Sequence, residues 1–126
     1  MLNYGYVVLR AAVARAIIAA GLHPSIGLHH SNDSNPMRLV DDVMEPFRPV
    51  IDWTVWNMAQ DGVCEVNTES KRKLIQSLYI DVLCDDLNTP VIVAIQKLAT
   101  SLGQIVDGEK INLILPDLKF EDTELI

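Results

Sequence analysis

The N-terminal stretch places the strongest constraint on what this chain can fold into. Residues 2–20 are predicted to form one helix, because the stretch is rich in alanine, the strongest helix former. Gly21, directly after it, is a typical helix stop. Apolar residues occur on nearly every face of this predicted helix, which is typical of a helix that has neighbours on several sides. We therefore expect a central helix within a helical bundle.

A second long helix is predicted to start at Asn35-Pro36. Asparagine is a good helix cap, and proline is favoured at the first helical position, where its missing N–H costs nothing. Apolar residues keep helical spacing to about residue 56 or beyond. Pro46 and Pro49 lie inside this stretch, and each removes an intrahelical hydrogen bond. We therefore expect one continuous helix with a kink.

Two further helices follow from the apolar spacing of the second half. One is expected over about residues 68–83, with Asn67 or Thr68 as its cap. The other is expected to begin at Thr89-Pro90 and to end near residue 106. The predicted fold class is therefore all-α, a bundle of four or five helices.

The predicted domain organisation is one helical domain followed by a tail. Residues 1–107 form the helical domain, and 49% hydrophobic residues are sufficient for a buried core. Residues 108–126 are expected to be a loose acidic tail, in which residues 111–115 form a short extended segment.

Charge and cysteine content limit the location and the partners of the chain. Arg10 and Arg15 interrupt the longest apolar run, so no membrane span is predicted. Cys64 and Cys84 are far apart and have no metal-binding spacing, which is typical of buried or idle thiols in a reducing compartment. The expected location is the cytoplasm. The net charge of −7 by itself argues against nucleic-acid binding, although acidic clusters can hold cations that bridge to phosphate.

Acidic residues in the second predicted helix have the spacing of a possible metal site. Asp42 and Glu45 are three residues apart and share one helix face, but Asp41 and Glu45, four apart, would do so as well. Mg²⁺ and Mn²⁺ prefer carboxylate oxygens, and Mn²⁺ also accepts an imidazole, for which His30 in the preceding loop is the candidate. Paired acidic residues on a helix more often form a solvent-exposed face, so the spacing alone does not decide between a metal site and such a face.

Four ordered motifs resemble a known family. They are Leu2 to Arg10 (LNYGYVVLR), Ala19 to Pro24 (AAGLHP), Gly27 to His30 (GLHH) and Leu39 to Pro49 (LVDDVMEPFRP). A later stretch, Asn67 to Lys71 (NTESK), also resembles the next helix of the same family. Together they resemble the C-terminal helical domain of the CRISPR-associated spacer-acquisition integrase and endonuclease, in the form found in type II systems.

The resemblance implies a set of metal ligands for Mg²⁺ or Mn²⁺. The Gly-x-x-His pattern of the family assigns His30, and the Asp-x-x-Glu before Phe-Arg-Pro assigns Asp42 and Glu45. Glu45 is the stronger assignment, with Asp42 as an alternate or supporting ligand. The family takes one more glutamate from a helix that precedes Leu2, together with a β-rich domain. Neither is part of this sequence, so the chain alone is expected to be inactive.

The resemblance also implies a reaction and partners. A DNA 3′-hydroxyl attacks a phosphodiester of the CRISPR repeat, which inserts a new spacer. The implied partners are protospacer and repeat DNA, a second copy of the full-length protein, and the small ferredoxin-fold CRISPR adaptation protein. Arg38, Arg48, Ser31 and Asn32 are candidate DNA contacts, although Arg48 can equally pair with a carboxylate of its own helix.

A second hypothesis comes from a different functional class. The missing glutamate and the charge of −7 would also fit a non-catalytic helical interaction fragment of a truncated gene. Tyr4, Tyr6, Trp53 and Trp56 are expected to be packing residues rather than platforms for bases.

Overall fold

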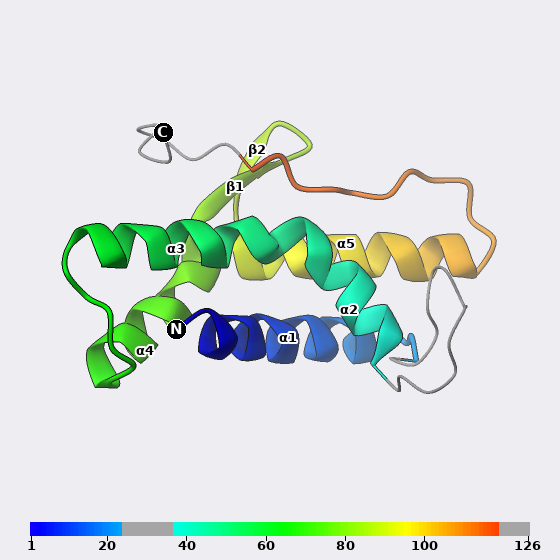
Figure 1. Cartoon of the computed structure of the whole chain (residues 1–126). Coiled ribbons are helices and arrows are strands. Elements are labelled where there is room, and N and C mark those ends of the chain that lie inside the picture. The colour runs from blue at the N-terminus through cyan, green and yellow to red at the C-terminus, as the bar shows by residue number, and fades with distance from the viewer. Residues whose placement is uncertain (24–36, 119–126) are drawn as a thin grey trace.

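The computed structural model describes residues 1–23 and 37–118 (Figure 1). Helices dominate this part of the chain, and one small two-stranded sheet accompanies them. The elements in chain order are α1 (Leu2–Ala19), α2 (Arg38–Met44), a 3₁₀ turn η1 (Glu45–Phe47), α3 (Arg48–Gln60), α4 (Thr68–Gln76), a 3₁₀ turn η2 (Ser77–Tyr79), β1 (Asp81–Cys84), β2 (Leu87–Pro90) and α5 (Val91–Val106).

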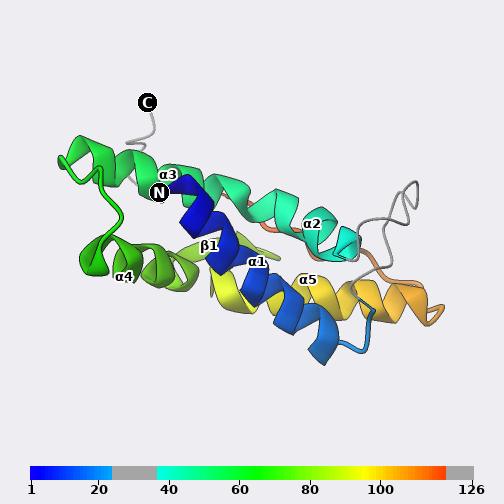
Figure 2. The same cartoon turned by 60° about the horizontal axis from the view of Figure 1, so that its bottom comes forward.

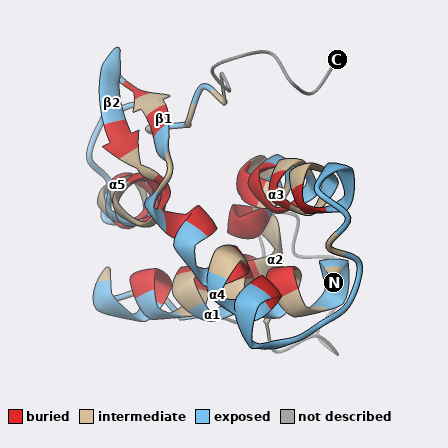
Figure 3. Ribbon diagram, turned by 90° about the vertical axis from the view of Figure 1, so that its left-hand side faces the viewer, coloured by how far each residue is buried: buried red, intermediate tan, exposed pale blue. Residues whose placement is uncertain are grey.

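Helix α1 is the centre of the bundle, as its sequence predicts. It contacts α2, α3, α4 and α5, and Figure 2 shows it running obliquely past α3 and α5 (compare Figure 1). Leu9, Val13 and Ile17 are fully buried against these neighbours. Figure 3 looks along the bundle and shows the buried faces of α1, α3 and α5 turned toward one another.

The end of α1 also matches the prediction. Gly21 has φ +80°, a backbone conformation that costs glycine little. The N–H groups of Gly21 and Leu22 donate to the carbonyl oxygens of Ile18 and Ile17, each at 3.0 Å. This pair of hydrogen bonds satisfies the last carbonyls of the helix and stops it there.

By length and composition α1 would also be long and apolar enough to cross a membrane. A core helix that is surrounded by protein meets the same criteria. In this structure α1 packs against four other helices and carries Arg10 and Arg15, so its apolar character is used for packing.

The two prolines lie where the helical stretch is interrupted between α2 and α3. Pro46 lies in η1 and Pro49 near the start of α3, where the backbone changes from α-helical to 3₁₀ and back. The predicted kink is therefore confirmed, and it divides the stretch into α2 and α3. Phe47 at the kink is fully buried, which fixes the bend against the core. The predicted start at Asn35-Pro36 lies outside the described residues.

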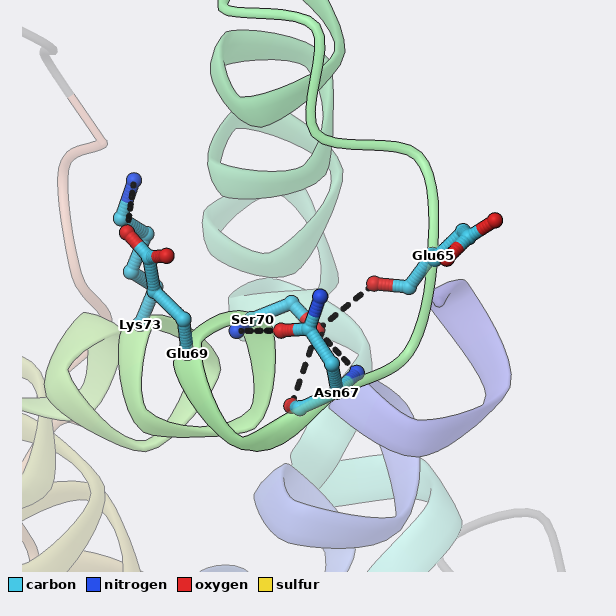
Figure 4. A network of polar contacts seen from close by, with 5 residues as sticks. All are labelled: Glu65, Asn67, Glu69, Ser70 and Lys73. Atoms are coloured by element: carbon cyan, nitrogen blue, oxygen red, sulfur yellow. Dashed lines mark hydrogen bonds and ion pairs between the residues drawn. The ribbon is translucent and has the colours of Figure 1, made fainter.

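The predicted helix over residues 68–83 is too long. The start is correct: the Asn67 side chain accepts a hydrogen bond from the Ser70 N–H at 2.9 Å, and the Asn67 N–H donates to the Ser70 hydroxyl at 2.8 Å (Figure 4). However, α4 ends at Gln76 and residues 81–90 form a β-hairpin.

The hairpin, which the all-α prediction missed, has a physical cause. Asp85 and Asp86 have φ of +51° and +64°, the left-handed conformations that a two-residue hairpin turn requires. Val82 and Cys84 point into the core from β1 while Asp81 is exposed, so one face of the strand is buried. Burial on alternate residues therefore outweighs the helical tendency of this stretch.

The chain after α5 runs back along the bundle to the hairpin (Figure 1). The Ile114 N–H donates to the Ser101 hydroxyl at 3.1 Å, and Asp117 pairs with Leu83 through two backbone hydrogen bonds. Residues 111–115, predicted to be a short extended segment, have no regular secondary structure in this structure. The tail is therefore tied to α5 and β1 as far as Leu118.

Candidate functional site

The candidate acids lie where α2 meets α3. Asp41 and Asp42 belong to α2, Glu45 opens η1, and Arg48 is the first residue of α3. The kink at Pro46 brings this stretch against the N-terminal half of α1. His30, Ser31 and Asn32 lie outside the described residues, so their predicted roles stay predictions.

Asp41 faces a cation from α1. The Arg10 Nε lies 3.2 Å from the Asp41 Oδ1, and both side chains are partly exposed. An exposed ion pair of this kind contributes little stability, but it fixes where the two side chains lie. Asp41 therefore has a partner that sequence spacing did not indicate.

Glu45 and Arg48 form the second ion pair of the site. The Arg48 Nε donates to the Glu45 Oε1 at 2.9 Å, and the glutamate side chain is 63% exposed. Of the two roles predicted for Arg48, the pairing with a carboxylate of its own helical stretch is therefore observed. The guanidinium carries further N–H donors beyond Nε, and these suit a phosphate group.

Tyr6 joins α1 to this cluster. The Tyr6 hydroxyl donates to the Asp52 Oδ1 on α3, and the Arg48 guanidinium carbon lies 5.0 Å from the centroid of the Tyr6 ring. The hydrogen bond to Asp52 raises the pKa of Tyr6 above its usual value of 10.0; burial and the charge of Asp52 also raise it, while Arg48 lowers it. Tyr6 was predicted to be only a packing residue.

Of these side chains, Tyr6, Arg10, Asp41 and Arg48 line one groove between α1 and the α2–α3 kink. Its volume is about 410 Å³. The lining residues are Asn3, Tyr6, Val7, Arg10, Asp41, Met44 and Arg48. Two guanidinium groups from different helices thus share one groove, in a chain whose net charge is −7. Such a groove is suited to an anion, because guanidinium groups bind phosphate oxygens in a fixed geometry.

Asp42 and Glu45 are the candidate carboxylate ligands of a hard divalent cation, and neither is among the residues that line the groove. Asp42 and Glu45 supply carboxylate oxygens, which Mg²⁺ and Mn²⁺ prefer. Across residues 1–23 and 37–118, no three side chains of His, Cys, Asp or Glu come together as a metal site. His30, which the resemblance assigns as a ligand, lies outside the described residues.

Arg38, the remaining candidate DNA contact in the described residues, and the aromatic residues predicted to pack are placed as follows. Arg38 is the first residue of α2 and is partly buried. Trp53 is partly buried on α3 and Trp56 is 38% exposed. Lys71 on α4 lies 5.4 Å from the centroid of the Tyr4 ring. Tyr4 and Tyr6 are therefore both stacked against cations.

The fold and the groove define a helical domain in which two arginines pair with carboxylates, and guanidinium groups are also able to bind phosphate oxygens. The family described as CRISPR associated protein Cas1 matches residues 1–79. The chain belongs to the Cas1 family.

Curated relatives carry the same family name. The CRISPR-associated endonuclease Cas1 of Neisseria meningitidis serogroup C is 36% identical over 93% of this chain and 40% of its own length. A Cas1 endonuclease of Saccharolobus solfataricus is 38% identical over 70% of this chain and 24% of its own length. One from Thermus thermophilus is 33% identical over 71% of this chain and 32% of its own length. The chain thus spans less than half the length of these relatives.

A solved structure supports the same placement. A casposase bound to an integration product superposes with a TM-score of 0.77 at 27% sequence identity. The match covers 96% of this chain and 38% of the casposase chain. The fold described here is therefore shared with part of a larger protein that is found with an integration product.

Proposed function

We propose that this chain is the helical part of a metal-dependent DNA integrase and endonuclease that inserts new spacers into CRISPR arrays. The observation that carries the proposal is the placement of Glu45 and Arg48 beside the groove, in a chain of the Cas1 family. In the proposed reaction a DNA 3′-hydroxyl attacks a phosphodiester of the repeat, and hydrolysis is the nuclease counterpart.

His30, Glu45 and Asp42 are the proposed ligands of a Mg²⁺ or Mn²⁺ ion. Asp42 is proposed rather than Asp41 because it is the aspartate of the Asp-x-x-Glu pattern before Phe-Arg-Pro, in a chain of the Cas1 family. When bound, the ion would polarise the scissile phosphate and stabilise charge on the attacking and leaving oxygens.

The polar and basic side chains near the ligands have a proposed role in holding DNA. Arg48 keeps further N–H donors for a phosphate while its Nε remains on Glu45. Arg38, Ser31 and Asn32 are the other proposed DNA contacts. Their part is to position the phosphodiester relative to the attacking hydroxyl, which lowers the barrier by orientation.

In this proposal residues 1–107 form the helical catalytic domain and residues 108–126 form an acidic tail. Protospacer and repeat DNA are its substrates, and a second full-length copy and the small ferredoxin-fold adaptation protein are its partners. The proposed location is the cytoplasm. The curated Cas1 relatives are longer than this chain, so the proposed integration is an activity of the whole protein.

Calorimetric titration with Mn²⁺ tests the metal site. The wild-type chain is expected to release or take up heat on binding, and the double variant His30→Ala, Glu45→Ala is expected to lose that signal. Glu69→Ala is the matched control, since Glu69 is an exposed carboxylate paired with Lys73 on α4, away from the groove. Identical, negligible heats for all three proteins would refute the proposed metal binding.

The alternative is a non-catalytic helical interaction fragment, which the net charge of −7 favours. Incubation of DNA with the pure chain and Mn²⁺ separates the two. Metal-dependent cleavage that Glu45→Ala abolishes would exclude the interaction fragment. An absence of both Mn²⁺ binding and cleavage would favour it.

A further inference from the structure

Tyr6 contacts two residues of α3 that are four positions apart. Its hydroxyl donates to the Asp52 Oδ1, and its ring lies against the guanidinium of Arg48, 5.0 Å from centroid to Cζ. Residues four apart on a helix are neighbours on its surface, so Arg48 and Asp52 would be able to pair with each other. The tyrosine thus lies against both members of a possible ion pair.

Arg48 pairs with a different carboxylate in the structure. Its Nε donates to the Glu45 Oε1 at 2.9 Å, three residues earlier in the chain. Two carboxylates, Glu45 and Asp52, are therefore within reach of one guanidinium. The side chain that distinguishes them is Tyr6, since its hydroxyl engages Asp52 while its ring covers one face of Arg48.

We propose that Tyr6 is a positioning residue that directs Arg48 to Glu45 by holding Asp52 away from it. The hydroxyl occupies Asp52 and the ring lies against the guanidinium, so that the Arg48 Nε stays on Glu45. This inference rests on the proposed function, in which Arg48 meets a DNA phosphate beside Glu45. Tyr6 itself does not contact the reacting groups in this proposal.

The variant Tyr6→Phe isolates the hydroxyl, because the ring and its stacking on Arg48 are retained. Asp52 is then free to compete, and Arg48 is expected to leave Glu45 for it. Removing the competitor as well, in Tyr6→Phe with Asp52→Ala, is expected to return Arg48 to Glu45. Rescue by a second substitution is not expected if Tyr6 merely supports the fold.

The Nε–Hε signal of Arg48 in a proton–nitrogen NMR spectrum of the whole chain reports this directly. The signal, assigned with Arg48→Lys, should move in Tyr6→Phe and return in the double variant. It should stay in place in Asp52→Ala and in Tyr4→Phe, the matched control, because Tyr4 stacks on a different cation. An unmoved signal in Tyr6→Phe, or a double variant that is not restored, would overturn the proposal.

Binding of a short fluorescein-labelled DNA duplex, measured against salt concentration, gives the functional consequence. Loss of one phosphate contact lowers the slope of log affinity against log salt by about 0.9. This loss is expected for Tyr6→Phe relative to wild type, and not for the double variant relative to Asp52→Ala, which has the same net charge. A slope that falls in both comparisons would contradict the role of Asp52 as competitor.

The two measurements separate the failure of this inference from the failure of the proposed function. A wild-type chain that binds no DNA would count against the proposed function, while the Arg48 signal would still decide what Tyr6 does. A chain that binds DNA with the same slope in wild type and Tyr6→Phe would refute the positioning role and leave the proposed function standing.

Discussion

Gly5 determines how closely α1 can approach α3 next to the Tyr6 contact, and Gly5→Ala measures how tight that approach is. A Cβ atom built at Gly5 would lie 2.5 Å from Cγ2 of Ile51 and 3.2 Å from Cδ2 of Leu74. Both side chains are fully buried, so neither methyl group has open space into which to move.

Two opposing effects set the magnitude for Gly5→Ala. Alanine is the better helix former, which should stabilise the fold by about 1 kcal/mol. Overpacking a filled core costs about 1–3 kcal/mol, and a contact this short belongs at the upper end of that range. The expected net effect is a free energy of unfolding lower by about 1–2 kcal/mol, or a Tm lower by about 4–8 °C.

Urea unfolding followed by circular dichroism is the assay. Ile51→Leu keeps the side-chain volume but removes the Cγ2 branch, so the double variant should lose less stability than the two single variants together. Val7→Ala, on the exposed side of the same helix, is the control for helix propensity alone. A Gly5→Ala chain more stable than wild type, or strict additivity with Ile51→Leu, would refute the close approach.

Three further predictions follow from single contacts. Asn67→Ala removes the side-chain acceptor that caps α4 and should lower the free energy of unfolding by about 1 kcal/mol in urea titrations. Tyr6 has a raised pKa in the folded state, so its contribution to the free energy of unfolding should be full below pH 10.0 and should fall above it, because the unfolded chain loses this proton first. In thermal unfolding at alkaline pH, the decrease in Tm should be smaller for Tyr6→Phe than for wild type. Cys64 is exposed, whereas Cys84 is fully buried and burial raises the pKa of its thiol, so a thiol reagent should label Cys64 quickly and Cys84 only after unfolding. Equal labelling rates for the two thiols would show that β1 does not cover Cys84.

The amino-acid sequence by itself determined the helices whose signals are local. Three features depend on residues within one or two turns of each other: the apolar residues on nearly all faces of α1, the stop at Gly21 and the bend at Pro46. The order of motifs from Leu2 to Glu45 was also sufficient to indicate the family, because a resemblance needs no knowledge of contacts.

The tertiary structure alone decided the pairing of distant residues. Tyr6 and Asp52 are 46 positions apart, and nothing in local spacing indicates that they share a hydrogen bond. Arg10 pairs with Asp41, which helical spacing does not indicate, because α1 packs against α2. The β-hairpin likewise depends on tertiary packing, because it buries Val82 and Cys84 against the core. Local patterns fix which segments are helical, whereas packing between segments fixes which charges meet.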